Sequence, residues 1–169
     1  MEYRCLLFDL DGTLLRSDKT ISPHTLRALE AFRERGVKIG ISTNRSENWA
    51  KPFLDQLGPE VIISSGGALV RCDGKIVFRA EISPQETRRV LDLIQKVCGA
   101  EAEITVDGET THYWNFKSDP GQVDKSWADT TNLDFKQYHG GTLKISAEIT
   151  EDETFSALKA ARVTGGRFC

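Results

Sequence analysis

The sequence has no cysteine pattern for binding a metal or forming a disulfide framework. Its four cysteines, Cys5, Cys72, Cys98 and Cys169, are widely separated and form no CxxC or Cys/His spacing. Neither a zinc site nor a set of disulfides is therefore indicated. Scattered, reduced thiols are typical of a cytosolic protein, so we expect a cytoplasmic location.

The sequence also lacks an excess of basic charge and a long apolar run. The 169 residues carry a formal net charge of -3, which gives no electrostatic footprint for nucleic acid or an anionic membrane surface. The N-terminal MEYRCLLFDLDG contains no long uncharged stretch, as a signal peptide or transmembrane helix would. We therefore expect no nucleic-acid or membrane partner, and any anionic ligand must be held by local geometry.

The first 68 residues alternate predicted strands with predicted helices. Three short apolar runs have the pattern of strands buried on both faces: residues 4–10, 37–43 and 61–65. Apolar residues at helical spacing lie between Ser22 and Gly36, and again from Trp49 to Gly58. This order predicts an α/β fold with part of a doubly wound parallel sheet and right-handed crossovers.

From about residue 69 the pattern changes to that of an α+β module. The predicted elements are hairpins at 68–80 and 102–116, a helix capped by Ser83 and Glu86 between them, a strand at 142–149 and a last helix from Thr150. Residues 117–141 carry no clear pattern. We therefore expect two domains, 1–68 and 69–169.

Two aspartates end the first predicted strand, in the stretch FDLDGTLL at residues 8–15. Asp9 and Asp11 would face the same side of a regular strand, at the sheet edge where α/β folds bind ligands. Two such acids could hold a divalent metal or divide nucleophilic and acid/base roles. Gly12 permits a tight turn, and Thr13 offers a hydroxyl and an amide to an oxyanion. The alternative is an ordinary Asp-Gly turn.

FDLDGTLL resembles the first motif of the haloacid dehalogenase superfamily of phosphotransferases, in which Gly-Thr follows two aspartates that flank one residue. GISTNRS, residues 40–46, is similar to the second motif, which reads Thr-Gly-Arg in the Cof-type branch. Asn44 replaces that Gly. ISSGGALV, residues 63–70, resembles the Asn-Gly-Ala segment of the branch, with Gly66 in place of the Asn. The module after residue 69 is similar to the type IIB cap of this family.

The resemblance implies a magnesium-dependent phosphatase that forms an aspartyl-phosphate on a small phosphorylated metabolite, such as a sugar phosphate. Asp9 would be the nucleophile, Asp11 the acid and then the base, and Mg²⁺ would be held by both residues. The phosphate would be bound by residues of the two loops: Leu10, Gly12, Thr13, Thr43, Asn44 and Arg45. For Thr43 to Ser46, a helix N-cap is the alternative.

Two further family motifs, a lysine and an acidic pair in a Gly-Asp loop, have no clear counterpart in the sequence. Lys144 lies in a predicted strand, and Glu151 and Asp152 lie at a predicted helix start, where acids are expected from the helix dipole. We therefore expect these 169 residues to be the N-terminal part of a longer ancestral protein.

The alternative function is that of an incomplete remnant that at most binds a phosphorylated ligand or a partner chain. A nucleotide-binding module is less favoured, because no GxGxxG or Walker loop follows the first strand. In this truncated design residues 4–10 would be an exposed edge strand, which predicts self-association.

Overall fold

The computed structural model describes residues 3–99, 102–115, 130–132 and 135–147. The chain divides into two compact units, Met1–Ala80 and Glu81–Cys169, which are described separately below. The helix expected from Thr150, and most of the unassigned stretch at 117–141, lie outside the described residues. Within the described ranges, no helix has the length and apolar character needed to cross a membrane.

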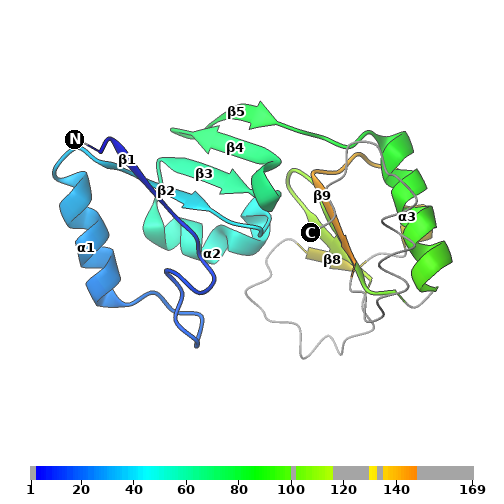
Figure 1. The fold of residues 1–169 in the computed structure, drawn as a ribbon, viewed down its shortest axis with the longest axis horizontal. Coiled ribbons are helices and arrows are strands. Elements are labelled where there is room, and N and C mark those ends of the chain that lie inside the picture. Colours follow the sequence, from blue (N-terminus) through cyan, green and yellow to red (C-terminus); the bar gives the residue numbers. More distant parts are fainter. Residues whose placement is uncertain (1–2, 100–101, 116–129, 133–134, 148–169) are drawn as a thin grey trace. The chain divides into compact units, whose positions relative to one another are not determined.

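The first unit is built on a five-stranded sheet with the order β1-β2-β3-β4-β5 (Figure 1). The strands are β1 (Cys5–Phe8), β2 (Lys38–Ser42), β3 (Val61–Ser64), β4 (Leu69–Cys72) and β5 (Lys75–Arg79). The first three are parallel, whereas β4 and β5 form an antiparallel hairpin on the β3 edge. The expected α/β fold with a partly parallel sheet is confirmed.

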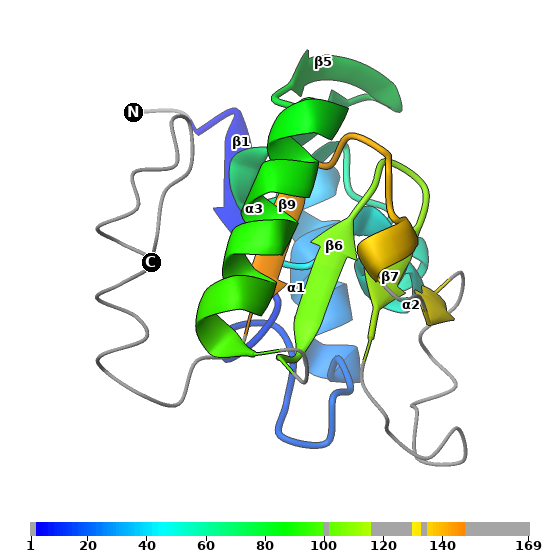
Figure 2. The same cartoon turned by 90° about the vertical axis from the view of Figure 1, so that its right-hand side faces the viewer.

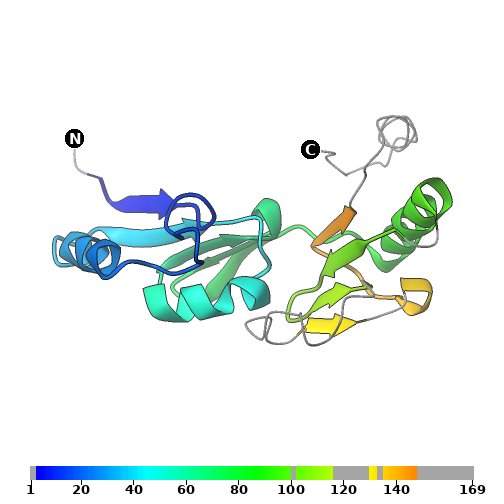
Figure 3. The ribbon, with the colours of Figure 1, turned by 90° about the horizontal axis from the view of Figure 1, so that it is seen from below.

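Two helices connect the parallel strands, and both start at a serine cap. They are α1 (Pro23–Arg33), capped by the Ser22 side chain, and α2 (Glu47–Leu57), capped by the Ser46 side chain. Figure 3 shows α2 running along one face of the sheet. Apolar side chains of both helices form one core with alternate strand residues: Leu6, Phe8, Leu29, Ile39, Ile41, Leu54 and Ile62. The core therefore lies on a single face of the sheet.

The opposite face and the β1 edge expose apolar side chains. In the described part of the chain β1 pairs only with β2. Tyr3 is 67% exposed, Leu7 on the face away from the helices is 52% exposed, and Phe78 on β5 is 53% exposed. Among the described strands, β1 therefore lies at the edge of its sheet and exposes apolar side chains.

The second unit contains a four-stranded sheet with the order β8-β7-β6-β9 and a helix, α3 (Pro84–Cys98). The strands are β6 (Ile104–Asp107), β7 (His112–Trp114), β8 (Thr130–Asn132) and β9 (Lys144–Ala147). Leu91 and Ile94 of α3 pack on Ile104 and Val106 of β6, and Figure 2 shows the helix beside β6 and β9. The Ser83 side chain caps α3 at Glu86, as expected.

The β4–β5 hairpin lies in the first unit, although its sequence was expected in the second module. It pairs with β3 over Leu69–Cys72, so the compact units divide after Ala80 and not after residue 68. Alternating polarity predicts a hairpin but does not say which sheet the hairpin joins. A hairpin that extends the parallel sheet therefore has the same sequence pattern as one in a separate module.

Candidate active site

The carboxyl ends of β1, β2 and β3 lie at one edge of the first sheet. Asp9 follows β1, Thr43 follows β2 and Ser65 follows β3. The last two loops are joined by backbone hydrogen bonds, from the Ser65 amide to the Arg45 carbonyl (2.8 Å) and from the Gly66 amide to the Thr43 carbonyl (3.3 Å). Parallel pairing therefore gathers the motif-bearing loops at the ligand-binding edge of the fold.

The loop after β1 is folded around Leu10, which is fully buried. The Leu10 carbonyl accepts hydrogen bonds from the amides of Leu14 (3.1 Å) and Leu15 (2.9 Å). Gly12 adopts φ 77°, in the left-handed region that glycine favours. The Leu10 amide donates to the Asp9 carboxylate (2.8 Å), so it already has an acceptor in this conformation. The loop thus holds the Asp9 carboxylate, while the side chains of Asp9, Asp11 and Thr13 remain exposed.

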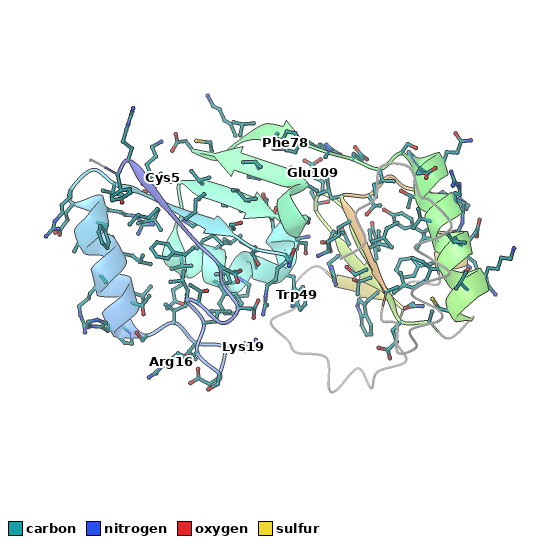
Figure 4. The ribbon with its side chains drawn as sticks, in the orientation of Figure 1. Cys5, Arg16, Lys19, Trp49, Phe78 and Glu109 are labelled. Carbon is teal, nitrogen blue, oxygen red and sulfur yellow. The ribbon has the colours of Figure 1, made fainter. Side chains whose placement is uncertain are left out.

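Asp11 joins the β1 loop to the β2 loop through Arg45. The guanidinium donates from Nε to Asp11 Oδ2 (2.7 Å) and from Nη2 to Oδ1 (2.8 Å), a two-point contact. Lys19 donates from Nζ to the same Oδ1 at 2.8 Å. Figure 4 shows Lys19 and Arg16 in the loop that joins β1 to α1. One carboxylate is therefore shared by two cations.

These contacts fix the protonation state of Asp11. The Arg45 guanidinium, more than any other group, holds the pKa of the Asp11 carboxyl far below its usual range, against the effect of partial burial and with help from Lys19. Arg45 itself lies over the rings of Trp49 (4.6 Å) and Phe53 (5.3 Å), with 11% of its side chain exposed. Asp11 is therefore a carboxylate, and Arg45 is held in place from the opposite side by two aromatic rings.

Thr43 is buried at the end of β2, and its Oγ1 accepts a hydrogen bond from the Arg45 amide (3.2 Å). The cap of α2 is Ser46, whose side chain accepts from the Trp49 amide (3.3 Å). Capping therefore accounts for Ser46 but does not explain Thr43. Thr43 and Arg45 lie close to Asp11, as the resemblance to the two motifs predicts. The side chains of Asn44 and Thr13 are exposed.

Asn44 and Gly66, the two residues that depart from the family pattern, are neighbours in the structure. Gly66 has φ 68°, and a Cβ built on it would lie 3.1 Å from Asn44 Oδ1. The Asn44 side chain thus occupies space that a side chain at position 66 would need. Sequence reasoning noticed both substitutions separately, but it had no signal that they are neighbours.

Three residues of this edge were missed by sequence reasoning. Lys19 lies in a loop with no periodic pattern, so nothing in the sequence brings it to Asp11. Ser64 and Ser65 bury hydroxyls that have no hydrogen-bond partner among the described residues. Serines after a strand are common in loops, so their burial could not be inferred from composition.

The donors at this edge suit Mg²⁺ in kind. The Asp9 carboxylate and the Asp11 main-chain carbonyl are oxygen ligands of the type that Mg²⁺ accepts. The described ranges contain no group of three or more His, Cys, Asp or Glu residues that could hold a metal. Asp9 and Asp11 would therefore contribute only part of a six-ligand shell.

The second unit has its own buried charged cluster, at the end of β6. His112 Nδ1 lies 2.6 Å from Asp107 Oδ1, and Lys144 Nζ lies 3.2 Å from Asp107 Oδ2. Burial alone would raise the pKa of Asp107, but His112 and Lys144 hold it below its usual value. Lys144, the lysine that stood out by pattern, is thus paired with Asp107 in the second unit.

Comparison with known proteins identifies the class to which this site belongs. The sequence pattern of the haloacid dehalogenase-like hydrolase family matches residues 6–164. The chain therefore belongs to the haloacid dehalogenase-like hydrolases, which confirms the predicted family.

Relatives and solved structures are longer than this chain. A Haemophilus influenzae protein is 28% identical across 97% of the chain and 64% of its own length. Pyridoxal phosphate phosphatase YbhA of Escherichia coli is 34% identical, over 56% of the chain and 35% of its own length. A HAD subclass IIB sugar phosphatase shares the fold, with a TM-score of 0.72 at 22% identity, over 92% of this chain and 62% of its own. The chain thus spans less than two thirds of each of these proteins.

Proposed function

We propose that the chain is a phosphatase of small phosphomonoesters that transfers the phosphoryl group to Asp9. The observation that carries this proposal is the contact of Arg45 with Asp11, which joins the two family motifs at one sheet edge. Relatives such as the pyridoxal phosphate phosphatase of Escherichia coli support a small phosphorylated metabolite as substrate. The sugar-phosphate class follows from the resemblance to the Cof-type branch.

In this proposal a carboxylate oxygen of Asp9 attacks phosphorus, and the bond from phosphorus to the leaving oxygen breaks. The leaving oxygen takes a proton, and water then hydrolyses the aspartyl-phosphate to release inorganic phosphate. Asp11 is the acid and base. As a carboxylate it suits the second half, in which it accepts a proton from the attacking water. Proton donation in the first half requires Asp11 to take up a proton from solvent beforehand, which becomes favourable once Arg45 and Lys19 turn from Asp11 to the phosphoryl group.

Phosphate binding would use groups at this edge of the sheet: the Thr43 hydroxyl, the Arg45 guanidinium and the exposed loop at Gly12 and Thr13. Leu10 and Asn44 belong to the same two loops and complete the proposed phosphate-binding set. Mg²⁺, when bound by the Asp9 carboxylate and the Asp11 carbonyl, would neutralise charge on the transferring group. The second unit would serve as the substrate-selecting cap of the family pattern. A cytoplasmic location stays a prediction.

A second candidate is a protein that binds a phosphorylated ligand or a partner chain without turnover. It is favoured by the pairing of Asp11 with two cations and by the short set of acidic ligands in the described ranges. The exposed β1 edge, with Tyr3 and Leu7, is the surface through which we propose self-association. A monodisperse monomer in light scattering at high concentration would contradict this part of the proposal.

The function is tested by hydrolysis of an aryl phosphate with and without Mg²⁺. Wild type is compared with Asp9→Asn and with Asp55→Asn, an exposed acid on α2 whose carboxylate pairs with Lys51 on the same helix. Turnover that needs Mg²⁺ and is lost in Asp9→Asn alone supports the phosphatase. Equal rates in all three proteins would refute it and leave the binding function.

A further inference from the structure

We propose that Lys19 is a second cation of the phosphate site, which binds the phosphoryl dianion of the substrate together with Arg45. This inference rests on the proposed function, because it extends the same site. It concerns a lysine that neither family motif includes.

The loop at residues 16–20 is built to hold Lys19 in a defined place. The Arg16 amide donates to the Thr20 carbonyl (2.9 Å), and the Lys19 amide donates to the Arg16 carbonyl (3.0 Å). The Asp18 carboxylate accepts from the Thr20 amide (3.0 Å) and from the Thr20 hydroxyl (2.6 Å). Lys19 itself has φ 59°, a conformation that residues with a Cβ seldom adopt. The turn therefore sets the direction of the Lys19 Cα–Cβ bond.

Lys19 and Arg45 converge on a single oxygen atom. Lys19 Nζ and Arg45 Nη2 both lie 2.8 Å from Asp11 Oδ1. Two cations this close together repel each other unless an anion lies between them. Asp11 supplies one negative charge and few acceptor positions, whereas a phosphoryl group supplies two charges and three oxygens that accept from both cations at once.

The charge balance shows what Lys19 adds. In the absence of Mg²⁺, Asp9, Asp11 and Arg45 alone sum to a net charge of about -1, and the field of such a site opposes a dianionic ligand. Lys19 brings the four side chains to neutrality. Its pair with Asp11 is exposed, at 59% for Lys19 and 41% for Asp11, and exposed pairs are weak. Lys19 can therefore move from Asp11 to a phosphoryl oxygen at little cost.

The test is calorimetric titration of the full chain with inorganic phosphate, with and without Mg²⁺. Lys19→Gln is compared with Lys51→Gln as a matched control, because Lys51 is 54% exposed and pairs with Asp55 at 2.9 Å on the surface of α2. Both variants lose one charge and one exposed pair, so their thermal stability should be equal. We expect Lys19→Gln to lose about ten-fold or more in phosphate affinity, as for a lost charge-assisted hydrogen bond, and Lys51→Gln to match wild type.

Lys19→Arg adds a second readout, since it keeps the charge and should retain affinity close to that of wild type. Equal affinity in Lys19→Gln and Lys51→Gln would overturn the role of Lys19 and leave the phosphatase proposal untouched. A wild-type chain that binds no phosphate at millimolar concentration would also overturn it. The phosphatase itself is judged separately, by the loss of turnover in Asp9→Asn.

Discussion

Gly66 and Asn44 lie against each other at the carboxyl ends of β3 and β2, so we predict that substitutions at the two positions are coupled. A Cβ on Gly66 would lie 3.1 Å from Asn44 Oδ1. Gly66→Asn should therefore destabilise the first unit, and Asn44→Gly in the same chain should recover part of the loss. The double variant carries Asn-Gly-Ala and Thr-Gly-Arg, the two patterns of the Cof-type branch.

The loss of stability expected in Gly66→Asn has two parts. An L-residue at the left-handed φ of Gly66 costs about 1 kcal/mol, less for Asn than for most residues. Overpacking against Asn44 adds about 1 kcal/mol, at the low end of such costs because Asn44 is exposed and its side chain can shift. We thus expect Gly66→Asn to lower the free energy of unfolding by about 2 kcal/mol, with about 1 kcal/mol of coupling to Asn44→Gly.

The assay is urea unfolding of the four proteins in a double-mutant cycle, followed by tryptophan fluorescence. Gly36→Asn is the control, because Gly36 has φ 76° and nothing within 4 Å of its Cβ position. It measures the backbone cost alone. Equal losses in Gly66→Asn and Gly36→Asn, or additive effects of the two loop substitutions, would refute the reasoning.

Three further changes test other parts of the structure. Arg45→Met should cost about 2 kcal/mol for the lost ion pair and ring contacts; the pKa of Asp11 should then rise toward its usual value in an NMR titration. Asp107→Asn should destabilise the second unit by about 3 kcal/mol, because the buried charge network loses its anion. Because the pKa of Asp107 is lowered in the folded state, Asp107 contributes to the free energy of unfolding at pH values above the usual aspartate pKa. This contribution is lost as the pH falls below the usual aspartate pKa, and acid unfolding followed by circular dichroism can check the loss. Gly40→Ala should cost about 1–3 kcal/mol by overpacking, and Leu7→Ala should relieve part of this loss in urea unfolding, because the new Cβ meets the Leu7 side chain.

Local patterns predicted most elements of the first unit. The run at 61–65 became β3 (Val61–Ser64), and the helix with Trp49 became α2 (Glu47–Leu57), which ends at Gly58 in the left-handed conformation. The meeting of Asp9 and Thr43 at one edge was also predictable, because parallel strands place their carboxyl ends together.

The remaining features depend on tertiary contacts that carry no local signal. The β4–β5 hairpin joins the first sheet because β3 offers it an edge, and the hairpin sequence does not encode that choice. Lys19 reaches Asp11 through a turn, and Asp107 meets His112 by cross-strand register. Single charged residues in loops are usually solvated, so the sequence gives no reason to single out Lys19 in advance.

The proposed phosphate binding and the proposed turnover make separable demands on the residues of this chain. The residues proposed to bind phosphate, from Leu10 to Arg45, all lie in Met1–Ala80, where hydrogen bonds join their loops. On the proposed function, phosphate affinity would therefore need only contacts that the first unit supplies. Turnover, as proposed, would also need a filled Mg²⁺ shell, to which Asp9 and Asp11 would bring only part. Suppose that phosphate affinity falls in Lys19→Gln, and that the rate of hydrolysis is the same in wild type and in Asp9→Asn. The chain would then be a phosphate-binding protein built on a phosphatase fold.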